Sequence, residues 1–288
     1  MPWYVFAILC AVFTGASGLI EKRALRFDHT MEYSTTFSIL RFLILIPLIF
    51  KLNFNIPANL IAYTFIAAFF TSIAFLFWAK ALRHMNISLA APITGLEPVV
   101  TVILAYFFLK EYLSIVQIFG IVLLFIGVYI LETHQHYKGT IIPLKDVLKS
   151  RHLIILFFSV ISFSIASLFS RDVLKQVDPF TFVFLSAFFI MINYNALTFI
   201  LYEGWHDIKK GLQKIGLYAL TAAIISVLIY YTASYAMSLA YVGLVIAIKR
   251  SSILIQVILG GTFFHEKYLT RKIVAAAIIV VSVFLIII

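Results

Sequence analysis

The sequence predicts an all-α integral membrane protein whose ten transmembrane helices form two inverted repeats of five helices each. Three observations support this fold class: the composition, the number of apolar runs, and a similarity between the two halves of the chain. Of the 288 residues, 63% are hydrophobic and only 12% are charged. A soluble domain is typically about 45–50% apolar and about 25% charged, so most of this surface must face lipid.

Ten apolar runs approach the roughly 17–25 residues that a helix needs to cross a bilayer. They lie at 3–20, 34–50, 59–79, 87–109, 115–131, 152–170, 180–201, 215–239, 242–264 and 272–288. Most links between them are short, so successive helices must run antiparallel. The first run lacks the basic amino-terminal region of a signal peptide and is interpreted as a span. The link 132–151 separates two expected domains, 1–131 and 152–288.

The two halves resemble each other when the numbering is shifted by 155 residues. This offset places "VILAYFFLKE" (102–111) on "VILGGTFFHE" (257–266), so that Glu111 falls on Glu266. Because five is an odd number, two copies of a five-helix unit enter the membrane from opposite sides and form inverted repeats. Such repeats are typical of secondary transporters, which bind substrate near the midplane and alternate its access.

Glu97 is the only one of twelve acidic residues that lies deep within a predicted span. Pro92, Gly95 and Pro98 lie close to it in the sequence and loosen the helical backbone. Freed backbone groups are tolerated at membrane depth only where they line a cavity or are buried in protein. Glu97 is therefore either a structural carboxylate satisfied by a neighbouring helix or a residue that lines a substrate pathway.

Lys249 and Arg250 interrupt the apolar run 242–264, although a charge at that depth costs about 2.5–3.5 kcal/mol on insertion scales. The offset aligns their segment with that of Glu97, and an ion pair would offset part of the cost of burying both charges. Consecutive helical residues point about 100° apart, so the two cations cannot serve one site alike. We expect Arg250 to face Glu97 or an anionic substrate group, whereas Lys249 either does the same or snorkels to the interface.

Two further cations are candidates for the same pathway. Arg41 lies a few residues into the second run, where it either snorkels to the interface or faces the interior. Lys80 ends the third run and is expected to contact lipid headgroups, yet the offset aligns it with Tyr235, so both could line equivalent cavity walls.

The segments 81–131 and 236–270 resemble the EamA-like branch of the drug/metabolite transporter superfamily. The features that carry the resemblance are Pro98, Glu111 followed by Leu113-Ser114, the pair Gly120 and Gly127, and Arg41-Phe42, which is similar to the family's basic residue in the second span. The second half departs from this pattern, because Ala276 and Val283 replace the paired glycines and Ile253 replaces Pro98.

The resemblance implies that the third and eighth spans look onto a central cavity. Trp78 in the third run and Tyr231 and Tyr235 in the eighth are therefore candidate substrate-binding residues, since an amphipathic ring can both stack on and hydrogen-bond a ligand. Packing between helices is the alternative role for each ring.

Catalytic, metal and nucleotide motifs are absent from the sequence. It has no phosphate-binding loop, Walker motif or nucleophile elbow, and His134 and His136 lack the neighbouring ligands of a metal site. The sequence therefore predicts a secondary transporter, working as an exporter of small polar metabolites such as amino acids or other carboxylate-bearing solutes. We expect no enzymatic activity and no cofactor.

The expected partners are the small-molecule substrate, membrane lipids and a coupling proton. The excess of basic residues lies in short links and indicates membrane orientation, so we expect no nucleic acid. Two alternatives remain open. An intramembrane enzyme would need a cluster of acid, base or metal-binding groups, and a structural membrane protein would have little reason to bury three charges.

Orientation in the cell membrane is predicted differently by two kinds of observation. The odd-numbered links hold fifteen Lys and Arg residues, and the even-numbered links hold four: Lys51, Lys110, Arg171 and Lys175. The positive-inside rule then places the odd-numbered links in the cytoplasm and both termini outside. The family resemblance implies cytoplasmic termini. We favour the charge count because the imbalance is large.

Overall fold

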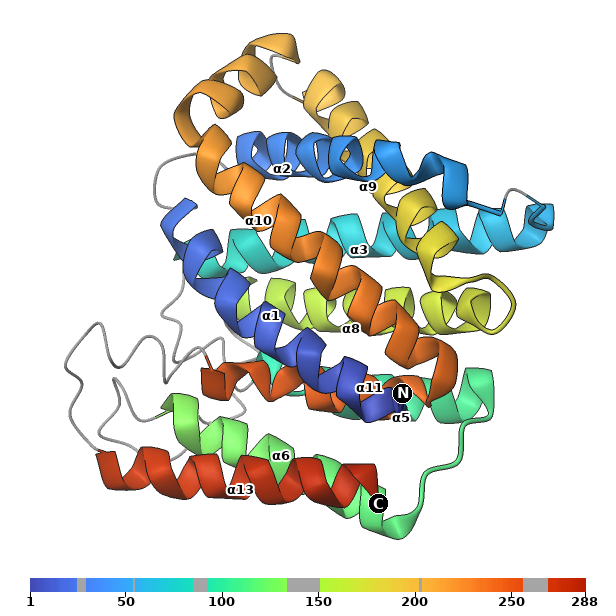
Figure 1. Ribbon diagram of the computed structural model, residues 1–288. Coiled ribbons are helices and arrows are strands. Elements are labelled where there is room, and N and C mark those ends of the chain that lie inside the picture. The colour runs from blue at the N-terminus through green and yellow to red at the C-terminus, as the bar shows by residue number, and fades with distance from the viewer. Residues whose placement is uncertain (25–29, 54, 85–92, 134–150, 202–203, 256–268) are drawn as a thin grey trace.

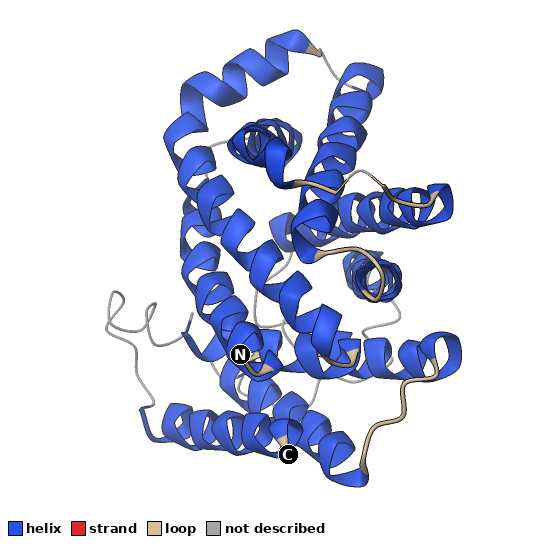
Figure 2. Ribbon diagram, turned by 45° about the vertical axis from the view of Figure 1, so that its right-hand side comes forward, coloured by secondary structure: helices blue, strands red, loops and turns tan. Residues whose placement is uncertain are grey.

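The computed structural model of the chain describes residues 1–24, 30–53, 55–84, 93–133, 151–201, 204–255 and 269–288. Regular structure within these ranges is helical throughout (Figure 2). Figure 1 shows the helices and their labels: α1 (Trp3–Ala24), α2 (Thr30–Leu45), the 3₁₀ helix η1 (Ile46–Lys51), α3 (Ala58–His84), α5 (Glu97–Leu109), α6 (Ile115–Thr133), α8 (Arg151–Leu174), α9 (Pro179–Leu201), α10 (Trp205–Leu239), α11 (Val242–Arg250) and α13 (Leu269–Ile287).

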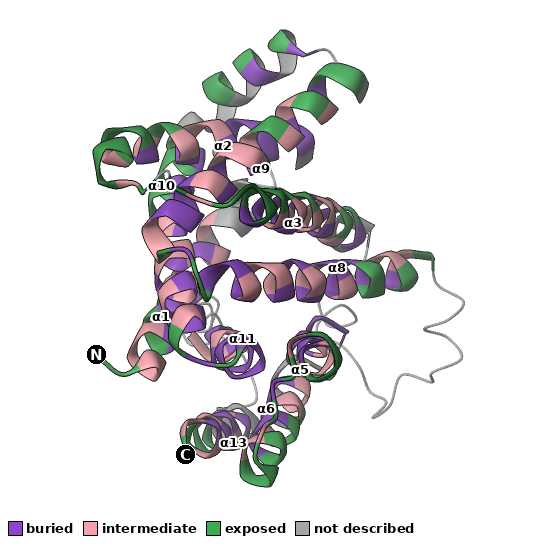
Figure 3. Cartoon of the chain, turned by 90° about the vertical axis from the view of Figure 1, so that its right-hand side faces the viewer, coloured by how far each residue is buried: buried purple, intermediate pink, exposed green. Residues whose placement is uncertain are grey.

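The fold is that of a multi-pass membrane protein. Within the described ranges, five segments are long and apolar enough to cross a bilayer: Met31–Lys51, Ala58–Ala81, Arg151–Leu174, Pro179–Ile200 and Leu217–Leu239. Shorter apolar helices fall within α1, α5, α6 and α13. Large apolar side chains cover the outside of the helices, as Phe107, Phe119 and Phe284 illustrate. Figure 3 shows these exposed positions on the outer faces of the helices and the buried ones between them.

Two helix boundaries differ from the predicted runs for local reasons. The predicted run 34–50 ends its α-helical part at Leu45 and continues as the 3₁₀ helix η1, in which Pro47 cannot donate a backbone hydrogen bond. Helix α10 begins at Trp205 rather than at 215. Its first turns, "WHDIKKGLQK", are too polar for a hydropathy criterion, but most of their residues are acceptable helix formers.

Two predicted runs are interrupted helices. Residues 95–96 form a turn immediately before α5, where Pro98 lacks a backbone N–H. Ser251 forms a turn after α11, and its hydroxyl donates a hydrogen bond to the carbonyl oxygen of Ile248 at 2.6 Å, so the side chain competes with the helical backbone pattern. The 155-residue offset places Gly95-Leu96 on Arg250-Ser251, so the interruptions lie at equivalent positions.

The contacts between helices fall into equivalent pairs when each helix of one half is replaced by its counterpart in the other half. If α1, α2, α3, α5 and α6 correspond to α8, α9, α10, α11 and α13, the contact of α3 with α8 matches that of α10 with α1, and the contact of α10 with α2 matches that of α3 with α9. Three helices contact their own counterparts, in the pairs α2–α9, α5–α11 and α6–α13. Both termini lie at one end of the helices, near the link between α5 and α6 (Figure 1).

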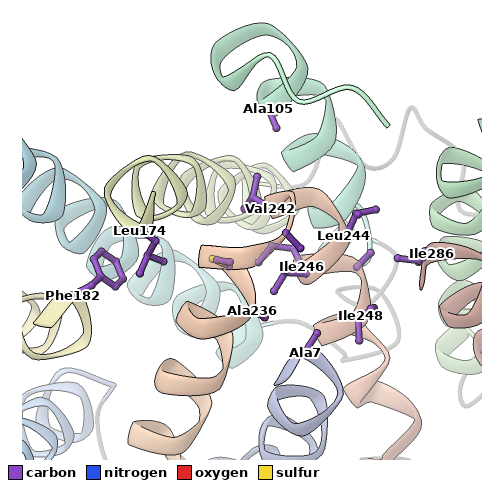
Figure 4. Packing of buried hydrophobic residues seen from close by; sticks show 14 of the residues in the cluster. Ala7, Ala105, Leu174, Phe182, Ala236, Val242, Leu244, Ile246, Ile248 and Ile286 are labelled. Carbon is purple, nitrogen blue, oxygen red and sulfur yellow. The ribbon is translucent and has the colours of Figure 1, made fainter. Parts of the chain in front are cut away.

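Helix α11 lies in the hydrophobic core. All seven residues from Val242 to Ile248 are buried, and Figure 4 shows them packed near Ala7 of α1, Ala236 of α10 and Ile286 of α13. At the α6–α13 contact, a Cβ atom on Gly127 would lie 2.9 Å from Cγ1 of Ile279. Small residues at such positions let two membrane helices approach closely.

Candidate functional site

Helices α5 and α11 bring Glu97 and Arg250 together. Glu97 is the first residue of α5 and Arg250 is the last residue of α11. Nη2 of Arg250 donates a hydrogen bond to Oε2 of Glu97, which confirms the predicted ion pair. The carboxylate lies at the positive end of one helix dipole and the guanidinium at the negative end of another, so both dipoles stabilise the pair.

The pair is only partly shielded from its surroundings. The Glu97 side chain is 6% exposed, whereas the Arg250 side chain is 23% exposed. A hydrogen-bonded chain from α8 holds the beginning of α5 in place: Thr101 donates to Oγ of Ser164 at 3.0 Å, and Ser164 donates to the Glu97 carbonyl oxygen at 3.5 Å. The guanidinium is therefore the more accessible partner, while the carboxylate is anchored on a fixed helix end.

Lys249 is close to a different helix. Its side chain is half-buried, and its charge is near enough to the Cys10 thiol of α1 to interact with it electrostatically. Consecutive helical residues point about 100° apart, and of the two adjacent cations it is Arg250 that the structure brings to Glu97.

A second ion pair joins the two halves at the other end of the α5–α11 pair. Nε of Arg171, near the end of α8, donates to Oε1 of Glu111 at 3.0 Å. The second carboxylate oxygen of Glu111 accepts the backbone N–H of Val242, the first residue of α11, at 2.9 Å. Nη1 of Arg171 donates to the carbonyl oxygen of Met237 near the end of α10. Glu111 and Arg171 are 5% and 9% exposed.

The sequence interpretation missed this network. Arg171 follows an apolar run and was counted with the charges of the even-numbered links, because nothing in its sequence neighbourhood identifies a partner sixty residues away. Glu111 did carry a signal, since its alignment with Glu266 marks a repeated position. Glu266 lies outside the described residues.

The four remaining aromatic and basic candidates near the third and eighth runs are not gathered at one point by the described contacts. Trp78 packs against Phe75 and the cluster around Leu156. Tyr231 and Tyr235 are brought together, with ring centroids 6.2 Å apart. Their other ring contacts are with Phe180 for Tyr231 (5.4 Å) and with Phe6 for Tyr235 (4.1 Å). Lys80 is exposed near the end of α3.

Arg41 lies deep between helices. Its residue exposure is 1%, so the interpretation in which it snorkels to the interface is wrong. Its guanidinium carbon lies 3.7 Å from the centroid of the Tyr230 ring on α10, which is a cation–π contact.

Metal-binding groups of three or more His, Cys, Asp or Glu residues do not occur within the part of the chain that the structure describes. His134 and His136, which the sequence interpretation excluded as a metal site, lie outside those residues.

Comparisons with known proteins give one sequence relative for less than half of the chain, a structure of similar fold for nearly all of it, and a family match in each half. The chain is 30% identical over 129 residues to the protein MJ1333.1 of Methanocaldococcus jannaschii, an alignment that covers 44% of this chain and 94% of the relative. A solved structure titled "Crystal structure of protein" shares the fold, with a TM-score of 0.76 and 15% identity over 98% of this chain and 94% of that one. The EamA-like transporter family matches residues 1–133 and again residues 150–288. The chain therefore belongs to the EamA-like transporter family, within the drug/metabolite transporter superfamily.

Proposed function

We propose that this protein is a secondary transporter that exports small polar metabolites across the cell membrane by alternating access. The observation that carries the proposal is the Glu97–Arg250 ion pair, which joins two interrupted helices from different halves of the chain. A buried charge pair within a membrane is costly and marks a substrate or ion pathway by default. The exposed part of Arg250 suits solutes with a carboxylate, such as amino acids.

The proposed architecture is ten spans in two inverted repeats, residues 1–131 and 152–288, with 132–151 as the linker. Three observations support it: the equivalent pairs of helix contacts, the equivalent positions of the two interruptions, and the two separate family matches. The relative from Methanocaldococcus jannaschii adds a fourth, because nearly its whole length aligns with less than half of this chain.

The length of α5 supports a position of the ion pair inside the membrane. Helix α5 has 13 residues, which corresponds to roughly 20 Å at about 1.5 Å per residue. If Glu111 marks one membrane surface, Glu97 lies about two-thirds of the way across a hydrocarbon layer about 30 Å thick. Inverted-repeat transporters bind substrate and coupling ions inside the membrane at interrupted helices.

The proposed mechanism uses competition for Arg250. A substrate carboxylate that binds Arg250 displaces Glu97, and the released carboxylate then accepts the coupling proton, because a buried carboxylate without a cation favours its neutral form. Removal of the ion pair loosens the link between α5 and α11 and permits the two halves to rock. Lys249, Trp78, Lys80, Tyr231 and Tyr235 are proposed to line the pathway that opens.

Flux in proteoliposomes tests this function. Purified protein is reconstituted and loaded with unlabelled amino acids or small carboxylates, and uptake of the radiolabelled solute is followed with and without a proton gradient. We expect saturable exchange of at least one carboxylate solute, absent from protein-free vesicles. Conversion of a solute into a new product would support the enzyme alternative, and folded protein without flux of any solute would support the structural alternative.

Orientation is tested separately with a reporter after Ile288. Following the charge imbalance between odd-numbered and even-numbered links, we expect a carboxy-terminal green fluorescent protein, which folds in the cytoplasm, to remain dark. Bright cells would establish cytoplasmic termini instead.

A further inference from the structure

Arg41 is a buried cation that the proposed competition at Arg250 does not use. It lies on α2 and is 1% exposed, and its guanidinium stacks on the Tyr230 ring of α10. The ring face attracts the charge but supplies no hydrogen-bond acceptor in the plane of the guanidinium.

Two of the Arg41 donors have no acceptor. Nε and Nη2 are both buried and make no hydrogen bond with any described residue. The buried Arg171 and the partly exposed Arg250 behave differently, because Arg171 binds Glu111 and Arg250 binds Glu97. Glu32, the other buried charge on α2, is nine residues away, or about 13 Å along the helix axis. A buried polar group without a partner is destabilising, and a charged one more so.

The geometry of the two free donors indicates what they bind. The Nε–H and one Nη2–H bond lie along the same edge of the planar guanidinium and point in nearly the same direction. This edge matches the two oxygens of a carboxylate, which arginine binds bidentately. In the second ion pair, Nε of Arg171 is the group that donates to Glu111.

Polar groups from two further helices lie near the Arg41 charge. The Tyr194 hydroxyl of α9 is near enough to interact electrostatically with both Arg41 and Tyr230, and it donates to the carbonyl oxygen of Ser72 on α3 at 3.4 Å. Helix α2 contacts α9 and α10, whereas Glu97 and Arg250 lie on α5 and α11. In Figure 1, α10 crosses α2, and α5 and α11 lie at some distance from this crossing.

We propose that the Nε/Nη2 edge of Arg41 binds the carboxylate of a small organic anion, in a site between α2, α9 and α10 that is distinct from the Glu97–Arg250 pair. The identification of this anion with the transported solute rests on the proposed transport function, whereas binding of the anion does not.

Thermal unfolding of the purified full-length protein tests the binding. Lactate, L-alanine and succinate are each compared with their uncharged-carboxyl analogues lactamide, L-alaninamide and succinamide. Ionic strength is held constant by adjusting the sodium chloride concentration of every sample. At about ten times its dissociation constant, a carboxylate should raise the unfolding midpoint by about 3–5 °C, and its amide should not. Stabilisation by none of the three carboxylates, or by each amide equally, would overturn the proposal.

Two variants locate the site. Arg41→Lys keeps the charge but removes the planar edge, so it should lose most of the stabilisation by carboxylate. Lys175→Gln removes a cation from an exposed surface pair and should retain it. An unchanged shift in Arg41→Lys, or an equal loss in Lys175→Gln, would overturn the assignment of the anion to Arg41. Inorganic phosphate is tested in the same assay. A larger rise in the unfolding midpoint with phosphate than with any of the three carboxylates would reject the carboxylate assignment.

A measurement on the wild-type protein covers the case in which Arg41→Lys fails to fold. Bound carboxylate should slow hydrogen–deuterium exchange in the peptides that contain Arg41 and Tyr230, as measured by mass spectrometry, while the matching amide should not. Equal exchange with both would overturn the proposal. Carboxylate binding at Arg41 without flux in vesicles would reject the transport function alone, and flux without such binding would reject the Arg41 site alone.

Discussion

The two ends of the α5–α11 pair hold their charges in different ways. At one end, both oxygens of Glu111 accept hydrogen bonds, and Arg171 binds a backbone carbonyl as well as the carboxylate. At the other end, Glu97 and Arg250 share an ion pair whose arginine is 23% exposed. A fully satisfied and buried network fixes a structure, whereas a partly exposed pair is open to competition by a ligand. Under the proposed function, the first end stabilises the fold and the second exchanges its ion pair for the substrate.

The largest expected effect follows from breaking the Glu111 network. Arg171→Ala leaves a carboxylate buried without its cation, which typically costs about 3–5 kcal/mol. Thermal unfolding in detergent measures this loss. Lys175→Ala is the matched control, since Lys175 pairs with Asp172 at 3.4 Å and both side chains are more than a third exposed; such a pair contributes about 0–1 kcal/mol. Equal effects of the two substitutions would contradict the comparison.

The exchangeable pair should affect flux more than stability. We expect Arg250→Ala to lower solute flux by about 10–100-fold, because a charge-assisted hydrogen bond contributes about 1.5–3 kcal/mol. The double variant Glu97→Gln with Arg250→Gln removes both charges. It should be more stable than Arg250→Ala, which leaves Glu97 without its cation, but its flux should remain as low. Normal flux in Arg250→Ala would separate this pair from transport.

The helix crossing between the two pairs gives a smaller effect. A Cβ atom on Gly243 would collide with Cγ2 of Val102 and lie 3.5 Å from its Cα. Gly243→Ala should therefore destabilise the protein by about 1–3 kcal/mol, as overpacking does. The second substitution Val102→Ala should restore most of the loss, and unfolding midpoints of the three variants test this. An additive loss in the double variant would show that the two side chains do not meet.

The smallest effect is expected at Lys249. Its charge lies near Cys10 of α1, and Glu97 is already paired with Arg250, so Lys249→Ala should lower flux less than about threefold under the conditions used for Arg250→Ala. A loss as large as that of Arg250→Ala would show that the adjacent cations act together.

The Glu97–Arg250 pair was predictable because three signals coincided: charges inside apolar runs, helix-loosening residues beside one of them, and a repeat that aligns their segments. The helices themselves follow from hydropathy, since lipid requires each spanning segment to satisfy its own backbone. Helix α10 was predicted too short, because its polar first turns depend on helix propensity and not on apolarity. The Arg171 contact could not be predicted, because the repeat offers no cation at the equivalent position.

In both ion pairs, the cation has no equivalent in the other half of the chain. This difference between the halves determines which of them can associate when they are separate polypeptides. The acids Glu97 and Glu111 come from the first half, and the cations Arg250 and Arg171 come from the second. The offset places Gly95 and Ala16 at the positions equivalent to those cations. A dimer of two first halves would therefore bury Glu97 and Glu111 without the arginines that pair with them. Only the second half supplies those arginines. Residues 1–133 and 150–288, produced as separate polypeptides, should form a heterodimer and not homodimers.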